Sequence, residues 1–524
     1  MKLKQMITWA GVTLVTLLGA GSVSGQGMPE DPREKYMNTI TADQVKGHIY
    51  FLADDLLEGR ETGERGQHLA GVYIRSQFMR MGLAAGNPVT GDYYQPFYLN
   101  STEIVEGEMK VRNDEFAYKT DYVSGNGGLL PSGEPDLAFV GYGIERDGYN
   151  NLAEVDLEGK VALMVAGQPE GGDPNMSLFG QIRAWKTRGL ALAEHGATGV
   201  IMVVPDSVFR VLKRYSRSNS TEIGAEPTPG TPLIYASEAM GEAMLKAGKT
   251  SIEKVRGKLD QSPDLPRVKT DRIRLVATSE MNFSSKEASN VLAFLPGSTD
   301  PDEVLVVTGH YDHVGVNSAG EIHNGADDDA SGTTTVLLVA EAFARAARAG
   351  FQPRRSILFM TVSGEEKGLL GSNFYTEHPL YPLEQTVANL NVDMVGRIDP
   401  KYSEREDSTR YVYLIGSDRI STDLHRWSET MNERYTGLTL DYTYNDENDP
   451  NRYYYRSDHY NFAENGIPVI FYFNGTHADY HKPTDDADKI RLEKVAKIAR
   501  LVFVTAWEVA NQSHPPKADV ITED

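Results

Sequence analysis

Continuous apolar runs alternate with helical segments over the second half of this chain, and this pattern most constrains its fold. A strand that is apolar at every position is buried on both faces, as in parallel sheets covered by helices. We therefore expect a large α/β domain from about residue 273 onward with a mostly parallel, buried sheet. Its expected strands are Val291–Leu295, Val304–Val307, Ile357–Val362, Val387–Val392 and Pro468–Phe473, and its expected helices include Thr333–Ala347 and Ile490–Trp507.

A smaller α/β unit precedes this domain. Strand-like runs begin at Leu137 and Gly159, a helix is expected over Ile182–His195, and the apolar run Val200–Val204 follows. Strand, helix and strand at this spacing indicate a compact α/β unit. It contains no cluster of metal-ligating side chains, and it ends near Pro263–Pro266. Nearer the N-terminus, residues 40–83 have helical spacing and residues 93–111 are expected to be extended.

The first 25 residues have the order of a secretory signal peptide. Lys2 and Lys4 precede an apolar run, Met6–Leu18, and small residues follow as far as Gly25. The run is shorter than the about 20 apolar residues that a spanning helix needs. We expect cleavage near Gly25, with an uncleaved anchor as the alternative. The mature protein is then exported, periplasmic or extracellular, without stable insertion in a membrane.

Charge and cysteine usage exclude several classes of protein. The chain has 74 acidic and 52 basic residues, a net charge of −22, which argues against nucleic-acid binding because phosphates require a basic face. The chain has no cysteine. This excludes a cysteine nucleophile, thiolate zinc fingers, iron–sulfur clusters, disulfides and a lipoprotein anchor. Any metal must therefore be bound by His, Asp and Glu.

Such side chains follow the expected strands at the points where the strands end. The segments after four strands contain His310 with Asp312, Glu365 with Glu366, Asp393, and His477 with His481, and three aspartates precede a helix at 327–329. In open α/β sheets the carboxyl ends of the strands share one edge, where sites form. Two histidines and three carboxylates suit two zinc ions that share a bridging carboxylate. A remaining carboxylate next to a ligand would act as a general base.

These motifs resemble those of the co-catalytic zinc exopeptidases that include secreted bacterial leucyl aminopeptidases and glutamate carboxypeptidases. The matching segments are Gly-His-Tyr-Asp at 309–312, Asn-Gly-Ala-Asp-Asp-Asp-Ala-Ser-Gly at 324–332, Gly-Glu-Glu at 364–366, Asn-Val-Asp-Met at 391–394 and Tyr-His-Lys-Pro-Thr-Asp at 480–485. The resemblance covers about residues 270–510 closely and 35–115 loosely. It implies a mostly parallel mixed sheet sandwiched by helices.

The resemblance also implies a role for each site residue. One zinc would be bound by His310 and Asp393, the other by Glu366 and His481, and Asp328 would bridge them. Glu365 would be the general base, and Asp312 would hold the imidazole of His310. Tyr454, three residues before Ser457, stands where some members place a tyrosine that stabilises the oxyanion, although Tyr453 and Tyr455 are alternatives. His477 competes with His481 as ligand, and His313, His323 and His459 are further candidates to line the cleft.

The expected domains are a signal peptide at 1–25, the first part of a peptidase domain at 26–115, a protease-associated domain at 116–268, and the metal-carrying part at 269–524. The expected function is that of an exported aminopeptidase with two Zn²⁺ per chain, acting on peptides with a free N-terminus. The alternatives are a carboxypeptidase or dipeptidase on the same scaffold, a single-metal glutaminyl cyclase, and a receptor-like binding module without activity. The sequence leaves the oligomeric state open.

Overall fold

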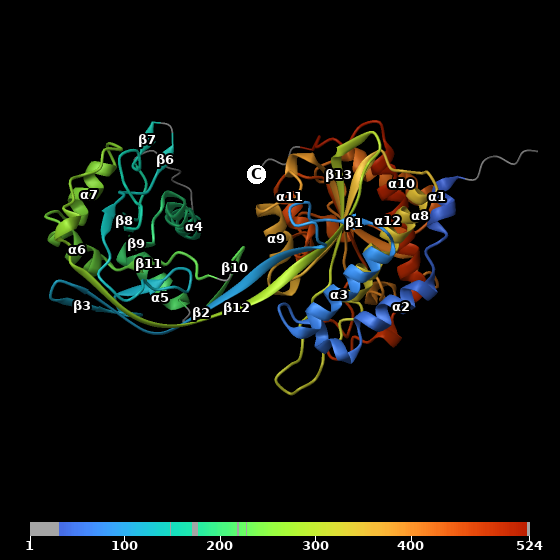
Figure 1. Ribbon diagram of the computed structural model, residues 1–524, viewed down its shortest axis with the longest axis horizontal. Helices are drawn as coiled ribbons and strands as arrows, with labels where there is room; N and C mark the ends of the chain where they lie inside the picture. The colour runs from blue at the N-terminus through green and yellow to red at the C-terminus, as the bar shows by residue number, and fades with distance from the viewer. Residues whose placement is uncertain (1–30, 147, 170–176, 217–218, 227, 521–524) are drawn as a thin grey trace, which may run out of the picture.

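The computed structural model describes residues 31–520 except 147, 170–176, 217–218 and 227. The expected signal peptide at 1–25 lies outside these residues. The described chain forms two lobes, each with its own sheet, joined by a pair of very long strands (Figure 1). Among the described helices, none combines the length and apolar composition that crossing a bilayer requires.

The larger lobe is built on a mixed sheet with the strand order β10-β2-β12-β14-β13-β15-β18-β16-β17. Its centre is parallel: β13 pairs with β14 and β15, and β15 pairs with β18, all in parallel. The bounds are β10 Asn219–Gly224, β2 Tyr94–Val111, β12 Leu275–Leu295, β14 Arg355–Val362, β13 Asp300–His310, β15 Thr386–Val392, β18 Val469–Phe473, β16 Tyr411–Ile415 and β17 Thr439–Asp441, with β1 Ala84–Ala85 on β12 and β3 Asp114–Ala117 on β2. Strands β14 and β15 are buried at every position, including the polar residues among their apolar ones.

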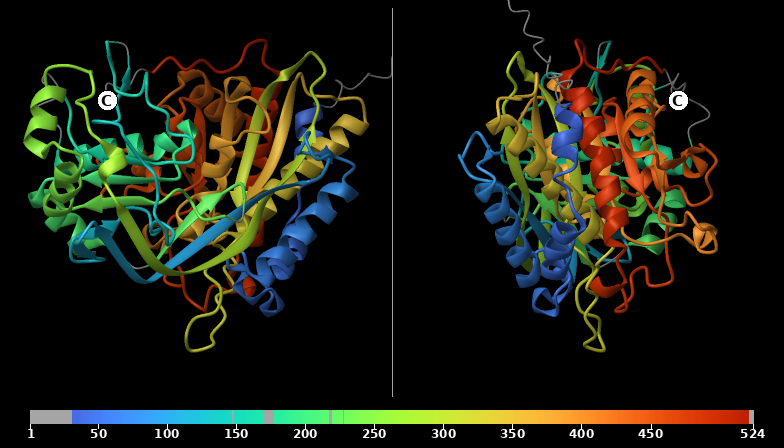
Figure 2. Two further views of the ribbon diagram at one scale, coloured as in Figure 1. Left: turned by 60° about the vertical axis from the view of Figure 1, so that its left-hand side comes forward. Right: turned by 90° about the vertical axis from the view of Figure 1, so that its right-hand side faces the viewer.

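Helices cover both faces of this sheet, which confirms the expected α/β architecture. One face packs against the N-terminal helices and against two long helices, α8 and α12, while α9 and α11 cover the other. The right-hand view of Figure 2 shows this layering. The bounds are α1 Pro32–Met37, α2 Ala42–Leu52, α3 Arg65–Arg80, α8 Ala330–Arg348, α9 Leu370–Glu377, α10 Thr422–Met431, α11 His459–Glu464 and α12 Leu492–Asn511. A short 3-10 segment, η1 Asp55–Arg60, connects α2 to α3.

The smaller lobe contains a five-stranded sheet with the order β4-β11-β9-β8-β5. All its pairs are parallel except that of β4 with β11. The bounds are β4 Tyr122–Ser124, β11 Leu233–Ala236, β9 Gly199–Val203, β8 Val161–Val165 and β5 Leu137–Phe139, with helices α4 Leu178–Ala191, α5 Asp206–Tyr215, α6 Glu238–Ala247 and α7 Ile252–Leu259 and a separate hairpin of β6 Glu145–Arg146 and β7 Tyr149–Asn150. Strand β5 is one edge of this sheet.

Strands β2 and β12 form an antiparallel ribbon that runs from one lobe into the other (Figure 1). Its register runs from Val291 opposite Tyr94 to Leu275 opposite Val111, with an irregularity between Glu280 and Met281. The sequence predicted β2 but placed a strand only at 291–295 in β12. Residues 278–287 of β12 are mostly polar and are all exposed or half-buried, so this part of the strand has no continuous apolar run. The apolar-run criterion therefore found only the last five residues of a strand of 21 residues.

Candidate metal centre

The side chains that follow the parallel strands meet at one edge of the large sheet. His310 is the last residue of β13, Asp393 directly follows β15, and Glu365 and Glu366 follow β14. The turn between β14 and Glu365 contains Gly364 with φ +82°, a conformation that glycine adopts without a steric penalty. Asp328 lies in the loop before α8 and His481 in the loop after β18. Segments far apart in the sequence are thus brought to one site.

The first group of ligating atoms surrounds Nε2 of His310. This nitrogen lies 3.3 Å from Oδ1 of Asp328 and 3.5 Å from Oδ1 of Asp393. Oε2 of Glu365 is 3.9 Å away. His310 and Asp393 are 1% and 6% exposed, so solvent does not satisfy these atoms.

The second group surrounds the other oxygen of Asp328. Nε2 of His481 lies 3.0 Å from Asp328 Oδ2 and 3.1 Å from Oε2 of Glu366. Asp328 therefore directs one carboxylate oxygen to each group. This is the arrangement that a bridging ligand requires.

The two groups fit divalent cations by spacing and by charge. Two donor atoms bound at 2.0–2.2 Å to one tetrahedral zinc lie about 3.3–3.6 Å apart, close to the separations found here. His310 Nε2, Asp328 Oδ2, Glu366 Oε1 and Asp393 Oδ1 are buried, and none has a hydrogen bond of good geometry to the described residues. Buried polar atoms in native proteins are satisfied, and carboxylates are not buried together without a counter-charge. Two cations would meet both requirements.

The backbone of the bridging loop is fixed by Asp485. Its Oδ2 accepts hydrogen bonds from the amides of Asp327, at 2.9 Å, and Asp328, at 3.3 Å. Its Oδ1 accepts a hydrogen bond from Arg397 Nη1, and Arg397 Nη2 donates to Oδ2 of Asp479 at 2.5 Å. Asp479 and Asp485 flank His481 in the sequence, so Arg397 clamps the loop that carries this ligand.

Asp312 contacts His310 differently from the expected carboxylate–imidazole pair. The backbone carbonyl oxygen of Asp312 lies 3.1 Å from His310 Nδ1, whereas its carboxylate Oδ1 lies 3.7 Å away. The carboxylate instead accepts hydrogen bonds from Thr62 Oγ1, at 2.6 Å, and from the amide of Glu365, at 3.2 Å. Asp312 thus orients the ligand through its backbone and holds the Glu365 turn through its side chain.

Glu365 lies beside the metal-ligating atoms and lines a small pocket in front of them. Asp328 and Asp393 also line this pocket, as do Met394, Tyr453, Arg456, Phe471, Phe473, Thr476 and Tyr480. Burial raises the pKa of Glu365 well above its ordinary value; His310 opposes this rise, and Glu366 and Asp393 add to it. Glu365 is therefore a carboxylate that faces the opening in front of the two groups of atoms.

The structure turns Tyr454 away from this pocket. Its ring packs under the guanidinium of Arg419, 4.0 Å from the ring centroid, and against His459. Residues 453–455 form one turn of 3-10 helix, in which consecutive side chains point in different directions. Tyr453 and, from another loop, Tyr480 line the pocket instead. The sequence shows three adjacent tyrosines without showing which one faces inward.

The remaining histidines differ in how close they lie to the two groups of ligating atoms. His477 Nε2 lies 3.2 Å from Asp327 Oδ2, outside both groups. His313 is fully buried beside the second group, with Nδ1 2.8 Å from Glu366 Oε1 and 3.9 Å from Asp328 Oδ2. His459 is buried against Phe471, and burial lowers its pKa to about 3. The sequence named His313 among the candidates to line the cleft, and the structure places it beside Glu366 of the second group.

Comparison with known proteins agrees with this geometry. Residues 290–506 match the model of peptidase family M28. The chain is 29% identical over 286 residues to a probable zinc metalloprotease of Pyricularia oryzae, covering 47% of this chain and 54% of that protein. It is 26% identical over 281 residues to aminopeptidase YwaD of Bacillus subtilis, covering 52% and 55%. The chain thus spans about half the length of these curated relatives.

Among solved structures, the aminopeptidase of Aneurinibacillus sp. strain AM-1 aligns with 94% of this chain and 98% of its own, at a TM-score of 0.46 and 18% identity. The matched residues 290–506 include His310, Asp328, Glu365, Glu366, Asp393 and His481. This part of the chain, which carries the candidate metal centre, is thus similar to peptidase family M28.

Proposed function

We propose that this protein is an exported aminopeptidase that uses two zinc ions to remove N-terminal residues from peptides. One zinc would be held by His310, Asp393 and Oδ1 of Asp328, and the other by His481, Glu366 and Oδ2 of Asp328. The observation that carries the proposal is the convergence of these side chains on two adjacent points, where His310 Nε2, Asp328 Oδ2 and Asp393 Oδ1 are buried without hydrogen-bond partners among the described residues. Relatives named zinc metalloprotease and aminopeptidase support the metal and the reaction.

When bound, the two cations polarise the scissile carbonyl and lower the pKa of a water molecule at the site. Glu365 would take the proton of the attacking water and deliver it to the leaving amine. The backbone amide of Glu365 donates a hydrogen bond to the carboxylate of Asp312, and this bond fixes the turn from which the Glu365 side chain projects. Tyr480 lines the same pocket and stacks on His481, and in this proposal its hydroxyl would donate a hydrogen bond to the developing oxyanion.

The aromatic and aliphatic pocket wall supports a preference for apolar side chains at the cleaved end. Met394, Phe471 and Phe473 form this part of the wall. We further propose that residues 1–25 are a signal peptide, and that the smaller lobe is a protease-associated domain inserted between the two parts of the peptidase domain at about 116–268.

A carboxypeptidase is the second candidate, and Arg456 is the observation that favours it. This exposed arginine lines the pocket and donates to Tyr480 OH at 3.3 Å, where it would meet a substrate carboxylate. Arg397, the other arginine near the motifs, is engaged by Asp479 and Asp485.

A cleavage assay with one peptide and its N-acetylated twin separates the two candidates. Mass spectrometry on the zinc-loaded protein is expected to show stepwise loss of N-terminal residues from the free peptide only. Loss of C-terminal residues from both peptides would replace the aminopeptidase proposal by the carboxypeptidase. Cleavage of neither peptide, with two zinc ions bound, would contradict both.

A further inference from the structure

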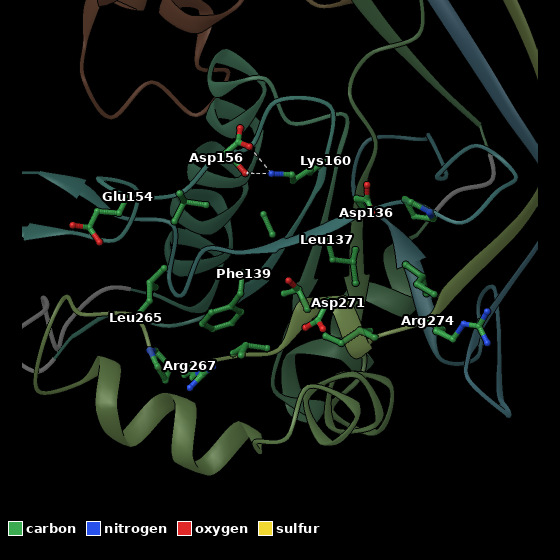
Figure 3. Close-up of a pocket in the computed structure, with 18 of the residues that line it drawn as sticks. Asp136, Leu137, Phe139, Glu154, Asp156, Lys160, Leu265, Arg267, Asp271 and Arg274 are labelled. Carbon is green, nitrogen blue, oxygen red and sulfur yellow. Dashed lines mark hydrogen bonds and ion pairs between the residues drawn. The ribbon is translucent and has the colours of Figure 1, made fainter.

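The smaller lobe has an unpaired sheet edge that opens onto a large pocket. The pocket has a volume of about 740 Å³ and lies between strand β5 and the segment 265–275, which leads into β12 (Figure 3). This volume is in the range of sites that hold ligands. It lies in a different lobe from the metal centre, and none of its lining residues belongs to the site described above.

In the described part of the chain, no strand pairs with the backbone groups of β5 that face the pocket. On its other side, β5 pairs in parallel with β8: Asp136 O accepts from Val161 N, and Val140 N donates to Leu163 O. Alternate residues of a strand turn their N–H and C=O groups to the same side. The groups of Leu137 and Phe139 therefore point away from β8, and no strand among the described residues pairs with that edge.

The pocket combines an apolar wall with an acidic rim. Leu137, Phe139, Leu265, Ile273 and Leu275 supply apolar surface. The charged lining residues are Glu134, Asp136, Glu154, Asp156 and Asp271 against Lys160, Arg267 and Arg274. Lys160 is bound by Asp156 at 2.6 Å, as Figure 3 shows, so four carboxylates remain against two guanidinium groups.

We propose that this edge binds an extended polypeptide segment with basic and apolar side chains, which adds a strand to β5. Strand addition satisfies main-chain groups of both partners, and the pocket beside the edge selects side chains. Up to four hydrogen bonds would form, with the N–H and C=O groups of Leu137 and Phe139. The acidic rim favours lysine or arginine in the segment. This inference rests on the proposed function, because a peptidase acts on polypeptides. The smaller lobe would then hold a substrate polypeptide while the larger lobe cleaves it.

The first experiment measures binding of a fluorescent hexapeptide of alternating lysine and valine, acetylated and amidated at its ends. Both blocked ends keep it from acting as an exopeptidase substrate, so binding is read independently of cleavage. Two derivatives carry N-methyl groups on the odd or on the even residues. We expect one derivative to bind at least tenfold more weakly and the other to bind as the parent does, because only alternate amides face β5. Equal effects of the two derivatives, or no binding of the parent, would overturn strand addition.

Matched charge variants locate the binding. Glu134→Gln with Glu154→Gln removes two pocket carboxylates, and Glu158→Gln with Glu253→Gln removes two exposed carboxylates of the same lobe that do not line the pocket. We expect the first pair to weaken peptide binding about 3–10-fold, because each lost carboxylate removes an ion pair of the strength measured at exposed sites. We expect the second pair to leave peptide binding unchanged. Equal weakening by both pairs would show general charge attraction and would contradict the site.

Hydrogen exchange at single-residue resolution gives the direct readout. Peptide binding is expected to slow exchange of the amides of Leu137 and Phe139 and to leave that of Ala138, which faces β8, unchanged. Slow exchange of Leu137 and Phe139 without peptide, together with self-association in sedimentation, would assign the edge to a second copy of the chain and overturn the proposal. If the protein cleaves short peptides but does not bind the blocked hexapeptide, only this inference is rejected. If it binds the hexapeptide but cleaves no peptide, only the proposed function is rejected.

Discussion

Arg397 and Asp485 form an ion pair, with 3.2 Å between Nη1 and Oδ1, that joins the loop after β15 to the loop that carries His481. Asp485 is fully buried and its other oxygen accepts from the amides of Asp327 and Asp328. The same pair of residues thus fixes both the bridging ligand and the terminal ligand of the second metal group. It does so without contacting a metal-ligating atom.

Arg397→Met is expected to weaken the second metal site selectively. The loop around His481 loses its clamp, and changes to groups that orient metal ligands typically cost 10–100-fold in metal affinity. Zinc titration should show one of two zinc ions binding about 10–100-fold more weakly, and Arg397→Lys should restore only part of this because an ammonium cannot donate in a fork. Arg419→Met is the control, because the guanidinium that it removes packs on the ring of Tyr454 and does not clamp the loop around His481. Unchanged affinity for both ions would contradict the clamp.

Glu365→Gln is expected to retain both zinc ions and lose activity. The amide keeps the shape of the side chain but cannot accept the proton of water, and general base catalysis contributes typically 10²–10⁴-fold. Elemental analysis of the dialysed protein measures zinc, and turnover of an aminoacyl anilide measures activity. A variant with near wild-type turnover would refute the assignment of the base.

The tyrosines near the site are expected to differ in effect. Tyr480→Phe should lower kcat about 10²-fold if its hydroxyl stabilises the oxyanion, since removal of such a donor costs about 10²–10³. Tyr454→Phe should change kcat by less than about threefold, because its ring lies against Arg419 and outside the pocket. The reverse order of effects in steady-state kinetics would restore the assignment made from sequence and contradict the geometry.

His48 is expected to make the protein less stable in acid. The side chain is buried between α2 and α3, with Nδ1 2.9 Å from Tyr73 OH. Burial lowers its pKa to about 4; Glu341 of α8 opposes this, and Arg80 of α3 adds to it. In the unfolded chain a histidine titrates near pH 6.5, so between about pH 6.5 and 4 the unfolded state binds more protons. The contribution of neutral His48 to the free energy of unfolding is therefore complete above pH 6.5, and it is lost as the pH falls to about 4.

Urea unfolding at pH 7 and pH 5 measures this effect. The contribution of His48 to the free energy of unfolding should fall by about 2 kcal/mol between these values. His48→Gln should remove that part of the pH dependence, while His68→Gln, which changes an exposed histidine on α3, should preserve it. An unchanged pH dependence in His48→Gln would show that other groups cause the acid sensitivity.

The sequence was informative where burial is uniform and where ligands follow strands directly. Strands β14 and β15 are buried at every position and are mainly apolar. His310 ends β13 after the apolar run Val304–Val307, and Asp393 directly follows β15, so their positions after apolar runs locate them in the sequence. The structure brings all five expected ligand residues and Glu365 to one site.

Interactions between distant polar residues were beyond the reach of the sequence. Arg397 and Asp485 are 88 residues apart, and nothing in their neighbourhoods marks them as partners. The choice among Tyr453, Tyr454 and Tyr455 depends on the direction of each side chain in one helical turn. Three residues are too few for a repeating sequence pattern to show these directions. Most of β12 was missed because its pairing with β2, rather than its apolar content, makes it a strand.

The β2–β12 ribbon also orders events in time as the chain is made. Glu103 pairs with Asn282, so 178 residues are synthesised after the first partner before the second one exists. By the end of that interval every strand of the smaller sheet has been synthesised, whereas β2 still lacks most of its partner β12. Because domains generally fold as units during synthesis, the smaller lobe can fold on the ribosome before the larger sheet has its central strands. The metal ligands, all of which come after residue 282, join last.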